Sequence, residues 1–196
     1  MLEIAIVAVA YLIGSVPTGY ILGSRAGIDI RNAGSGNIGA TNVARVLGKR
    51  HGILTLLVDI GKGYLAVFIA TKLSPNLSVA ALAGAAVFLG HLYPVFLRFR
   101  GGKGVATAFG VYLALAPLAT LGLIVIFAVN VLTSRIVSLS SMITAGAAPF
   151  VLWLFSYPLD LVAMSAFFAV MIILRHHANI KRLLHGNEPR FGVSSR

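Results

Sequence analysis

Glycines and small polar residues alternate in one segment of the chain, which ends on an arginine. The glycines at positions 34, 36 and 39 can adopt positive φ and turn backbone N–H groups inward, and a helix beginning near residue 41 would add its positive end. This pattern predicts a binding site for phosphate or another oxyanion, because a plain glycine-rich connector would not need the polar side chains. The candidate binding residues are Ser35, Gly36, Asn37, Thr41, Asn42 and Arg45.

The same glycines have the Gly-x-Gly-x-x-Gly spacing of dinucleotide-binding folds. That fingerprint has meaning only after a buried strand in a βαβ unit, and no parallel sheet is expected around Gly34. A nucleotide-hydrolase phosphate loop is excluded too, because Gly39 is followed by Ala40 and Thr41 where that loop requires lysine. We therefore interpret the match as coincidental.

A second candidate site surrounds Lys103, which lies among Gly101, Gly102 and Gly104 just before an apolar segment. Free N–H groups at the start of a helix and the lysine ammonium could converge there on one phosphate. Basic residues that flank a membrane span are ordinary, and this accounts for the two arginines that precede the segment. It does not account for the three glycines, so the lysine is a candidate phosphate ligand.

A third group of polar residues comes from two places late in the chain. Ser138 and Ser141 are three residues apart, as are His176 and Asn179, so each pair shares a face if its segment is helical; Arg175 adjoins the second pair. A histidine at such a position is more often a hydrogen-bonded structural residue than a catalyst. Metal binding is not expected, because His176 and His177 diverge on a helix and no carboxylate lies nearby. No cofactor is expected either.

The composition defines the elements that must position these groups. Of 196 residues, 58% are hydrophobic and 11% charged, with a net charge of +11, which is too little charge to cover the surface of a soluble domain. The chain has no cysteine, which excludes disulfides, thioester intermediates and cysteine-bound metals. Its five carboxylates are too scattered for a hard-cation site or a two-carboxylate glycosidase site. We therefore expect a membrane protein with a basic rim.

The apolar segments predict an all-α integral membrane protein with seven transmembrane helices, because a span needs about 20 apolar residues. The longest apolar run is divided at Pro117, since proline lacks the N–H that a helix interior requires. The first segment lacks the basic start of a signal peptide and is expected to be retained. The expected spans are residues 4–23, 53–73, 78–97, 105–116, 117–133, 139–155 and 161–174.

The basic residues predict the orientation of these spans. With seven spans, one side of the membrane holds the loops at about 24–52, 98–104 and 134–138 and the tail 175–196. Every Lys and Arg except Lys62 and Lys72 lies on that side. Short basic loops remain in the cytoplasm, so the N-terminus is expected outside and the C-terminus in the cytoplasm. Residues 1–196 are expected to form a single transmembrane domain, with all three candidate sites on its cytoplasmic side.

Two charged residues lie inside the second expected span. Asp59 and Lys62 are three residues apart and can neutralise each other. Intramembrane charges are costly and often functional, but a pair that stabilises helix packing is an equal alternative. His91 and Tyr93, near the end of the third span, are similarly ambiguous, and all four are left out of the candidate site.

Together the motifs resemble the bacterial membrane-integral glycerol-3-phosphate acyltransferases that use acyl phosphate, and the similarity extends from Gly14 to about Leu184. The resemblance implies that an acyl phosphate acylates sn-glycerol 3-phosphate, forming lysophosphatidate and inorganic phosphate for phospholipid biosynthesis. It implies a multi-pass protein of the bacterial inner membrane that contacts lipid, acts as a monomer, has a cytoplasmic active site and needs no cofactor. The motifs that carry it are Gly34–Asn42 with Arg45, Gly101–Gly104, Val137–Leu139 with Ser141, and Arg175–His176 with Asn179.

The resemblance assigns roles to the candidate residues. Lys103, Ser141, His176 and Asn179 would be catalytic, and the others, including Ser138 and Arg175, would bind substrate or shape the phosphate site. An acyl phosphate is already activated, so direct attack by the glycerol hydroxyl needs no cysteine, only positioning and charge neutralisation. His176 would serve either as the general base or as an orienting hydrogen-bonding group, because the phosphate of the donor could also accept the proton.

Two other functions fit the composition less completely. A transporter of phosphorylated metabolites would use a basic entrance, but the polar clusters lie on one side and the halves show no paired repeat. A scaffold for acidic lipids would explain the charge and leave the glycine-rich segments unexplained. Nucleic-acid binding is not expected, since membrane orientation already accounts for the basic residues.

Overall fold

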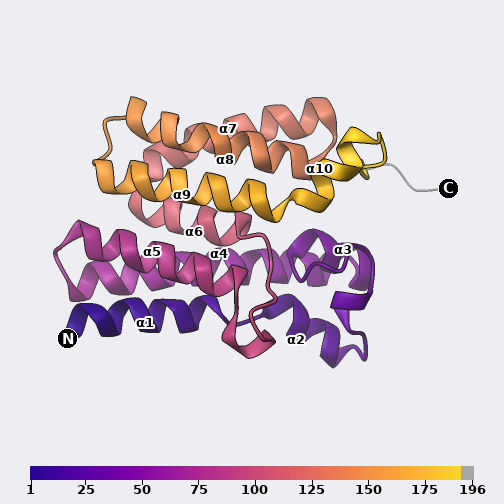
Figure 1. The fold of residues 1–196 in the computed structure, drawn as a ribbon, viewed down its shortest axis with the longest axis horizontal. Helices are drawn as coiled ribbons and strands as arrows, with labels where there is room; N and C mark the ends of the chain where they lie inside the picture. Colours follow the sequence, from indigo (N-terminus) through magenta and orange to yellow (C-terminus); the bar gives the residue numbers. More distant parts are fainter. Residues whose placement is uncertain (191–196) are drawn as a thin grey trace. The chain divides into compact units, whose positions relative to one another are not determined.

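The structure is a computed structural model that describes residues 1–190, and its regular elements in that range are all helices. The chain divides into two compact units, the first of residues 1–115 and the second beginning at Ala116 (Figure 1). The helices are α1 Leu2–Gly14, α2 Thr18–Arg25, η1 Ile30–Asn32, α3 Ala40–Leu47, α4 Lys49–Leu73, α5 Leu77–Leu92, η2 Val95–Leu97, α6 Val105–Leu115, α7 Pro117–Ser134, α8 Val137–Leu154, α9 Leu159–Arg175 and α10 His177–Leu184.

In the first unit, α1 packs along α5, and α4 contacts α3, α5 and α6. Glycines allow the closest of these approaches. A Cβ atom on Gly63 of α4 would lie 2.2 Å from the carbonyl oxygen of Thr107, and one on Gly110 of α6 would lie 2.0 Å from that of Ile60. Small residues let membrane helices approach backbone to backbone, so these two glycines determine the spacing of α4 and α6.

Replacing Gly63 with alanine is expected to destabilise the protein. The new methyl group would meet main-chain atoms of α6. Overpacking of this kind lowers the free energy of unfolding by about 1–3 kcal/mol. Each kcal/mol lowers Tm by about 2–4 °C in a chain of this size. Gly61→Ala in the same helix is the matched control, because nothing lies within 4 Å of its added Cβ. Equal Tm values for the two variants in detergent would show that α4 and α6 are not held together at Gly63.

In the second unit, α8 packs against both α7 and α9, and α10 continues from α9 after a bend of 58° (Figure 1). The chain between α7 and α8 consists of Arg135 and Ile136 alone, and Arg135 has a φ of 58°. This αL residue ends α7 and lets α8 return antiparallel to it. The short loop brings Ser138 to the start of α8, at the same end of the unit as α10.

Five segments within residues 1–190 are long and apolar enough to cross a membrane, and the bent pair of α9 and α10 makes a sixth. The expected all-helical membrane fold is therefore confirmed. The seventh expected span corresponds to α6, which has 11 residues and is about 16 Å long, shorter than the roughly 30 Å hydrocarbon core. A total of seven spans remains a prediction. The five segments are Leu2–Arg25, Lys49–Leu73, Leu77–Leu97, Pro117–Ser134 and Val137–Leu154.

Two prolines show how far local sequence predicts helix ends. The expected break at Pro117 is confirmed, since α6 ends at Leu115 and α7 begins at Pro117. The apolar span expected at residues 4–23 corresponds to the segment Leu2–Arg25, but that segment is not one continuous helix, because α1 ends at Gly14 and α2 starts only at Thr18. Pro17 lies in this second break, where its missing N–H and its ring interrupt the helix.

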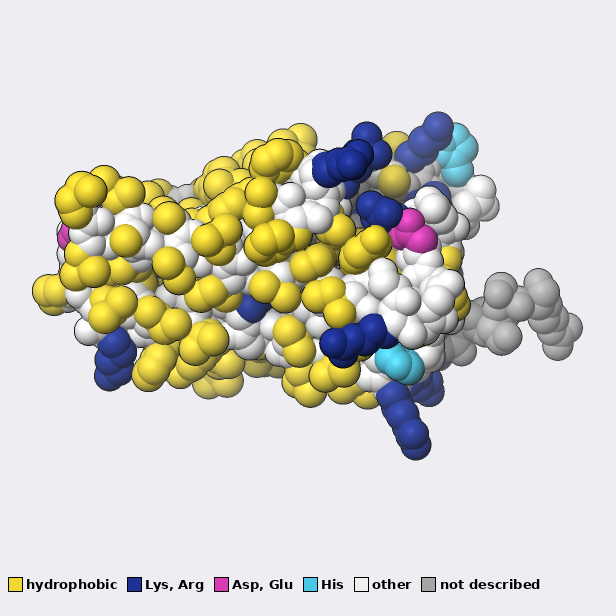
Figure 2. Space-filling model, turned by 90° about the horizontal axis from the view of Figure 1, so that it is seen from below, with side chains coloured by type: hydrophobic (Ala, Val, Ile, Leu, Met, Phe, Trp, Pro, Cys, Tyr) yellow, Lys and Arg dark blue, Asp and Glu magenta, His cyan; other side chains and the backbone are white. Residues whose placement is uncertain are grey.

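The surface agrees with a lipid environment. On the face drawn in Figure 2, hydrophobic side chains cover most of the area, and Lys and Arg side chains gather mainly near one end. In the second unit Val125, Leu132 and Trp153 are each more than half exposed. Apolar side chains this exposed are expected where lipid, and not water, is the solvent. Residues 191–196 of the expected cytoplasmic tail lie outside the described residues.

Candidate functional site

The glycine-rich segment of the first unit is a tight loop between η1 and α3. Gly34 and Gly36 have φ values of 61° and 70°, so the expected positive φ is confirmed at these two positions, whereas Gly39 has a φ of −78°. Helix α3 begins at Ala40, next to the expected start near residue 41. The loop is therefore built as the sequence indicates, with its glycines at the sharp turns.

Asn42 organises this loop from the first turn of α3. Its side chain is buried and donates to the carbonyl oxygens of Ile30, Ala33 and Asn37 at 3.3, 2.9 and 2.9 Å. Its Oδ1 accepts a hydrogen bond from the backbone N–H of Ser35 at 2.7 Å. These contacts use the hydrogen-bonding capacity of the amide. Asn42 therefore shapes the loop.

Three backbone N–H groups of the loop are already bound within it. The N–H of Ser35 donates to Asn42, that of Gly36 to the carbonyl oxygen of Ala33 at 3.0 Å, and that of Gly39 to Asn37 Oδ1 at 2.8 Å. The expectation that these groups turn inward to bind an anion is therefore wrong for all three, because internal acceptors satisfy them. The candidate side chains Ser35, Thr41 and Arg45 are exposed.

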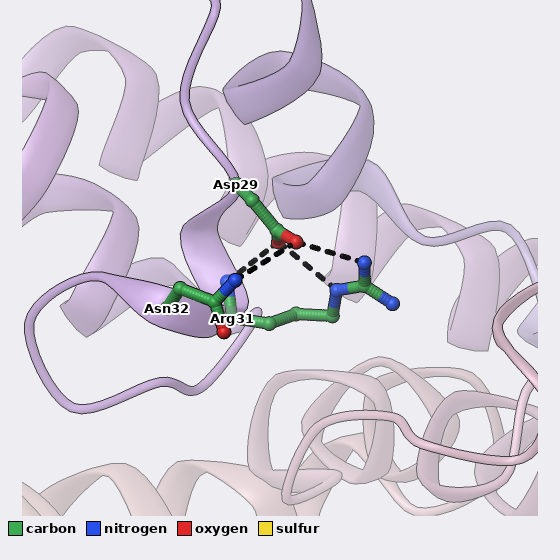
Figure 3. Close-up of polar contacts among 3 residues, drawn as sticks. All are labelled: Asp29, Arg31 and Asn32. Carbon is green, nitrogen blue, oxygen red and sulfur yellow. Dashed lines mark hydrogen bonds and ion pairs between the residues drawn. The ribbon is translucent and has the colours of Figure 1, made fainter.

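A neighbouring arginine is already neutralised. Arg31 binds Asp29 through Nε and Nη2, at 2.9 and 2.8 Å, and Asn32 adds a weaker contact to the same carboxylate (Figure 3). The hydrogen bonds from the Arg31 side chain and N–H hold the pKa of the Asp29 carboxyl below its usual range. The Arg31 guanidinium also lies 4.7 Å from the centre of the Tyr20 ring. Arg31 is thus a structural part of the loop, which leaves Arg45 as its candidate ligand.

The Lys103 segment lies across the end of α5. The N–H groups of Gly101 and Gly102 donate to the carbonyl oxygens of Leu92 and His91 at 3.1 and 3.0 Å. Gly104 has a φ of 86°, which turns the chain into α6 at Val105. The segment is therefore an ordered loop joined to the core, with Lys103 half-buried directly before the helix.

In the second unit the candidate residues are buried around two helix ends. Ser138, Ser141, His176 and Asn179 are each at most 6% exposed, while Arg175 is half-buried. His176 lies at the junction of α9 and α10, not within one straight helix as expected. The two residues remain in contact at this bend, because the Asn179 N–H donates to the His176 carbonyl oxygen at 2.8 Å.

Glu188 joins two of these residues. Its Oε1 accepts hydrogen bonds from Ser138 Oγ at 2.7 Å and from Asn179 Nδ2 at 2.5 Å, and its Oε2 pairs with Arg182 Nε at 2.6 Å. Its side chain is 7% exposed. The tail thus folds back so that a carboxylate lies among donors from α8 and α10.

Sequence reasoning missed Glu188 and Arg182 because it considered carboxylates only as metal ligands or paired acids. The available signal was the isolation of Glu188, the one acidic residue in the basic stretch that follows Arg175. Of the candidate residues in this unit, Ser138 and Asn179 are brought together by Glu188. Ser141 Oγ donates separately to the Val137 carbonyl oxygen at 2.8 Å, and His176 Nδ1 donates to that of Ile172 at 2.7 Å.

The Glu188 contacts should make stability depend on pH. Burial acts to raise the pKa of this carboxyl, but hydrogen bonds from Ser138, Asn179 and Arg182 outweigh burial and hold the pKa below its ordinary value of 4.5. A carboxyl with a lowered folded pKa stabilises fully above its unfolded pKa and loses that contribution as pH falls through the folded value.

We therefore expect the Tm of the protein in detergent to fall as pH is lowered below 4.5. Glu188→Gln should have a lower Tm at neutral pH and a flatter dependence on acid, since its amide does not titrate. Parallel Tm curves for the two proteins would show that Glu188 does not contribute to the acid dependence.

The described part of the chain contains no group of three or more His, Asp or Glu side chains that could hold a metal ion. His177 is exposed and donates to the Leu174 carbonyl oxygen at 3.1 Å. The candidate ligands of the first unit are cations, hydroxyls and amides, which suit an anion, whereas those of the second unit surround the Glu188 carboxylate.

Known proteins match this chain over nearly its whole length. A family model described as glycerol-3-phosphate acyltransferase matches residues 4–186. Relatives named glycerol-3-phosphate acyltransferase include one from Geobacter sulfurreducens, 50% identical over 96% of this chain and 97% of its own. Another, from Aquifex aeolicus, is 42% identical over 97% of this chain and 100% of its own.

Solved structures give the same result. The chain is similar to PlsY (YgiH), an integral membrane glycerol 3-phosphate acyltransferase, in its glycerol 3-phosphate form, with a TM-score of 0.93, 42% identity and coverage of 97% and 96% of the two chains. The lysophosphatidic acid form of PlsY matches with a TM-score of 0.90 and 41% identity, over 97% of this chain and 95% of that one. The chain therefore belongs to the glycerol-3-phosphate acyltransferase family of integral membrane enzymes.

Proposed function

We propose that this chain transfers an acyl group from acyl phosphate to sn-glycerol 3-phosphate, giving lysophosphatidate and inorganic phosphate. The observation that carries the proposal is the match to PlsY in two forms, one with glycerol 3-phosphate and one with lysophosphatidic acid, which correspond to a substrate and a product of this reaction. Family membership favours this enzyme over the transporter considered from the sequence.

The reaction requires no covalent enzyme intermediate. The glycerol hydroxyl oxygen forms a bond to the acyl carbon, the bond from that carbon to the phosphate oxygen breaks, and the hydroxyl proton leaves with the phosphate. The absence of cysteine and the scarcity of carboxylates suit an activated donor of this kind. The protein must neutralise two phosphates and orient the hydroxyl towards the carbonyl.

In this proposal the first unit neutralises the phosphates. Lys103 and Arg45 supply the positive charge and Ser35 and Thr41 supply hydroxyl donors, all from ordered loops or the helix ends beside them. Gly36, Asn37 and Asn42 maintain the first loop, and Gly101, Gly102 and Gly104 allow the second to lie close to α5.

The second unit orients the reacting groups. Ser138, Ser141, Asn179 and His176 supply short, buried side chains that can hold the glycerol portion and the acyl carbonyl, and Arg175 adds a cation beside them. Glu188 positions Ser138 and Asn179 by accepting their hydrogen bonds. A buried set with fixed rotamers meets the geometric demand of direct acyl transfer.

The hydrogen bond of His176 favours an orienting role over that of a general base. Its Nδ1–H donates to the neutral carbonyl of Ile172, which in the neutral ring places the lone pair on Nε2. That lone pair could accept a proton, but the acceptor of the Nδ1–H is a neutral carbonyl, whereas in catalytic triads it is a carboxylate that stabilises the charged ring. The phosphate of the donor would then accept the hydroxyl proton.

His176→Gln is therefore expected to retain more of kcat than His176→Ala, because glutamine can still make a hydrogen bond. A general base would contribute about 10²–10⁴-fold to the rate. If kcat falls by that factor in both variants, and the decrease of kcat at acidic pH disappears in them, His176 is the base. Steady-state kinetics from acidic to neutral pH make the comparison.

We place seven spans in the bacterial cytoplasmic membrane, with the N-terminus outside, the C-terminus in the cytoplasm and the reaction on the cytoplasmic side. The distribution of Lys and Arg supports this orientation. We also propose that residues 1–196 act as a single transmembrane domain and that the enzyme functions as a monomer without a cofactor.

The decisive experiment supplies purified protein with a long-chain acyl phosphate and glycerol 3-phosphate and measures both phosphate and lysophosphatidate. The proposal expects the two products in equal amounts. Acyl-CoA and acyl carrier protein thioesters serve as alternative donors in parallel reactions. Activity with a thioester and none with acyl phosphate would overturn the donor assignment while leaving the acceptor unchanged.

A further inference from the structure

A buried charged cluster in the first unit is not used by the reaction described above. Asp59, Lys62 and His91 are 2, 7 and 5% exposed. Lys62 Nζ lies 2.8 Å from Asp59 Oδ1, and His91 Nδ1 lies 3.6 Å from the same oxygen. Charges inside a membrane span are costly, and apolar residues of similar size would pack two helices at lower cost. The cluster therefore calls for a role beyond joining α4 to α5.

One end of the cluster reaches the break between α1 and α2. Lys62 Nζ donates to the carbonyl oxygen of Val16 at 3.0 Å, in the three-residue gap between these helices. Thr18 opens α2, and within residues 1–190 its buried Oγ1 has no hydrogen-bond partner. At the next residue, a Cβ atom on Gly19 would lie 1.9 Å from the carbonyl oxygen of Ile38. The glycine-rich loop that contains Ile38 thus lies directly on the segment that Lys62 holds.

The other end of the cluster reaches the Lys103 segment. A Cβ atom on Gly102 would lie 2.1 Å from His91 Nε2, so the imidazole lies directly against that glycine. The Gly102 N–H also donates to the His91 carbonyl oxygen. The ring is therefore enclosed between the Asp59 carboxylate on its Nδ1 side and the Gly102 backbone on its Nε2 side.

A narrow crevice runs along the cluster and the break between α1 and α2. Its lining includes Ile38 from the glycine-rich loop, Pro94 from the segment just after α5, and Asp59, Lys62 and His91. The two segments that carry the candidate phosphate ligands are thus supported by one connected network within the first unit. It consists of the hydrogen bond from Lys62 to Val16, the ion pair of Lys62 with Asp59, the 3.6 Å approach of His91 to Asp59, and the packing of the His91 ring against Gly102.

We propose that Asp59, Lys62 and His91 are positioning residues that hold the glycine-rich loop and the Lys103 segment in register for phosphate binding. The network runs from the Val16 carbonyl through Lys62, Asp59 and the His91 ring to Gly102, the residue before Lys103. This role rests on the proposed function of Lys103 in catalysis, whereas the support of the two segments is a separate property that can be measured without turnover.

The test separates positioning from simple charge pairing. Asp59→Asn and Lys62→Met each leave a buried charge unpaired and are expected to lower the folded yield. The double variant removes both charges, so it should recover yield and Tm. If the network positions the segments, the double variant will still have a kcat/KM about 10- to 100-fold below that of the parent, through a raised KM and a lowered kcat. Lys72→Met, at an exposed lysine of the same helix, is the matched control.

His91→Phe provides a second variant that keeps a ring beneath Gly102, removes its contact with Asp59 and leaves the ion pair intact. Amide hydrogen exchange over residues 34–39 and 101–104 reports the segments directly. Faster exchange in both the double variant and His91→Phe is expected. Parent-like exchange would overturn the inference, whatever the activity. Faster exchange with parent-like kinetics would retain the positioning and overturn the proposed role of Lys103.

Discussion

Replacing Lys103 with alanine is expected to lower kcat by about 10²–10³-fold, the effect of removing a preorganised group that stabilises charge in the transition state. Lys103 is half-buried in an ordered loop just before α6, so part of its side chain is shielded from water. Charge neutralisation is stronger in such a setting than at a fully hydrated site. Initial rates with acyl phosphate and glycerol 3-phosphate measure the loss.

Lys72→Ala is the control for this variant. Lys72 is an exposed lysine at the C-terminal end of α4, with its ammonium 5.4 Å from the centre of the Phe68 ring. Removing it changes net charge equally and should leave kcat unchanged. The kcat of Lys103→Arg is expected to lie between those of the parent and Lys103→Ala, because arginine keeps the charge but has a different shape. Near-normal turnover by Lys103→Ala would remove this residue from the catalytic set.

Replacing Glu188 with alanine is expected to have the second largest effect, on both stability and activity. Loss of the carboxylate leaves Ser138 and Asn179 without their shared acceptor and Arg182 without its ion-pair partner. Hydrogen bonds to charged groups contribute about 1.5–3 kcal/mol each, and the Arg182 contact counts for less because that side chain is 35% exposed. A decrease of roughly 3 kcal/mol in the free energy of unfolding would lower Tm by about 6–12 °C.

The same substitution should raise the KM for glycerol 3-phosphate, since Ser138 and Asn179 lose the group that orients them. Glu188→Gln keeps one acceptor and should fall between the parent and Glu188→Ala in both measurements. Glu3→Gln is the control, because Glu3 is exposed in the first turn of α1. A folded Glu188→Ala protein with parent-like Tm and KM would mean that this carboxylate positions neither residue.

The sequence predicted those features that depend on neighbours along the chain. Runs of apolar residues predicted helices at α4, α5, α7, α8 and α9, and Pro117 predicted the end of α6. The positive φ of Gly34 and Gly36 followed from the same local reasoning. Span length, proline chemistry and glycine conformation act over a few residues, so they can be read without knowledge of the fold.

The break at Pro17 and the partners of the glycine-rich loop were not predictable in this way. The first apolar run is long enough for one helix, and only the structure shows that its interruption exposes the Val16 carbonyl to Lys62, 46 residues away. Similarly, the loop was expected to direct its N–H groups to an anion, but Asn42, Ala33 and Asn37 accept those of Ser35, Gly36 and Gly39. Which of several possible acceptors a donor finds depends on packing, not on spacing.

By itself the sequence determined that this chain is a helical membrane protein with basic, glycine-rich and serine-rich segments suited to phosphate, because hydropathy, charge and residue chemistry are properties of the chain alone. Only the tertiary structure decided that Glu188 joins Ser138, 50 residues away, to Asn179, and that His91 lies between Asp59 and Gly102. A buried polar group must find its partner wherever folding brings one, and that choice is made by contacts between distant segments.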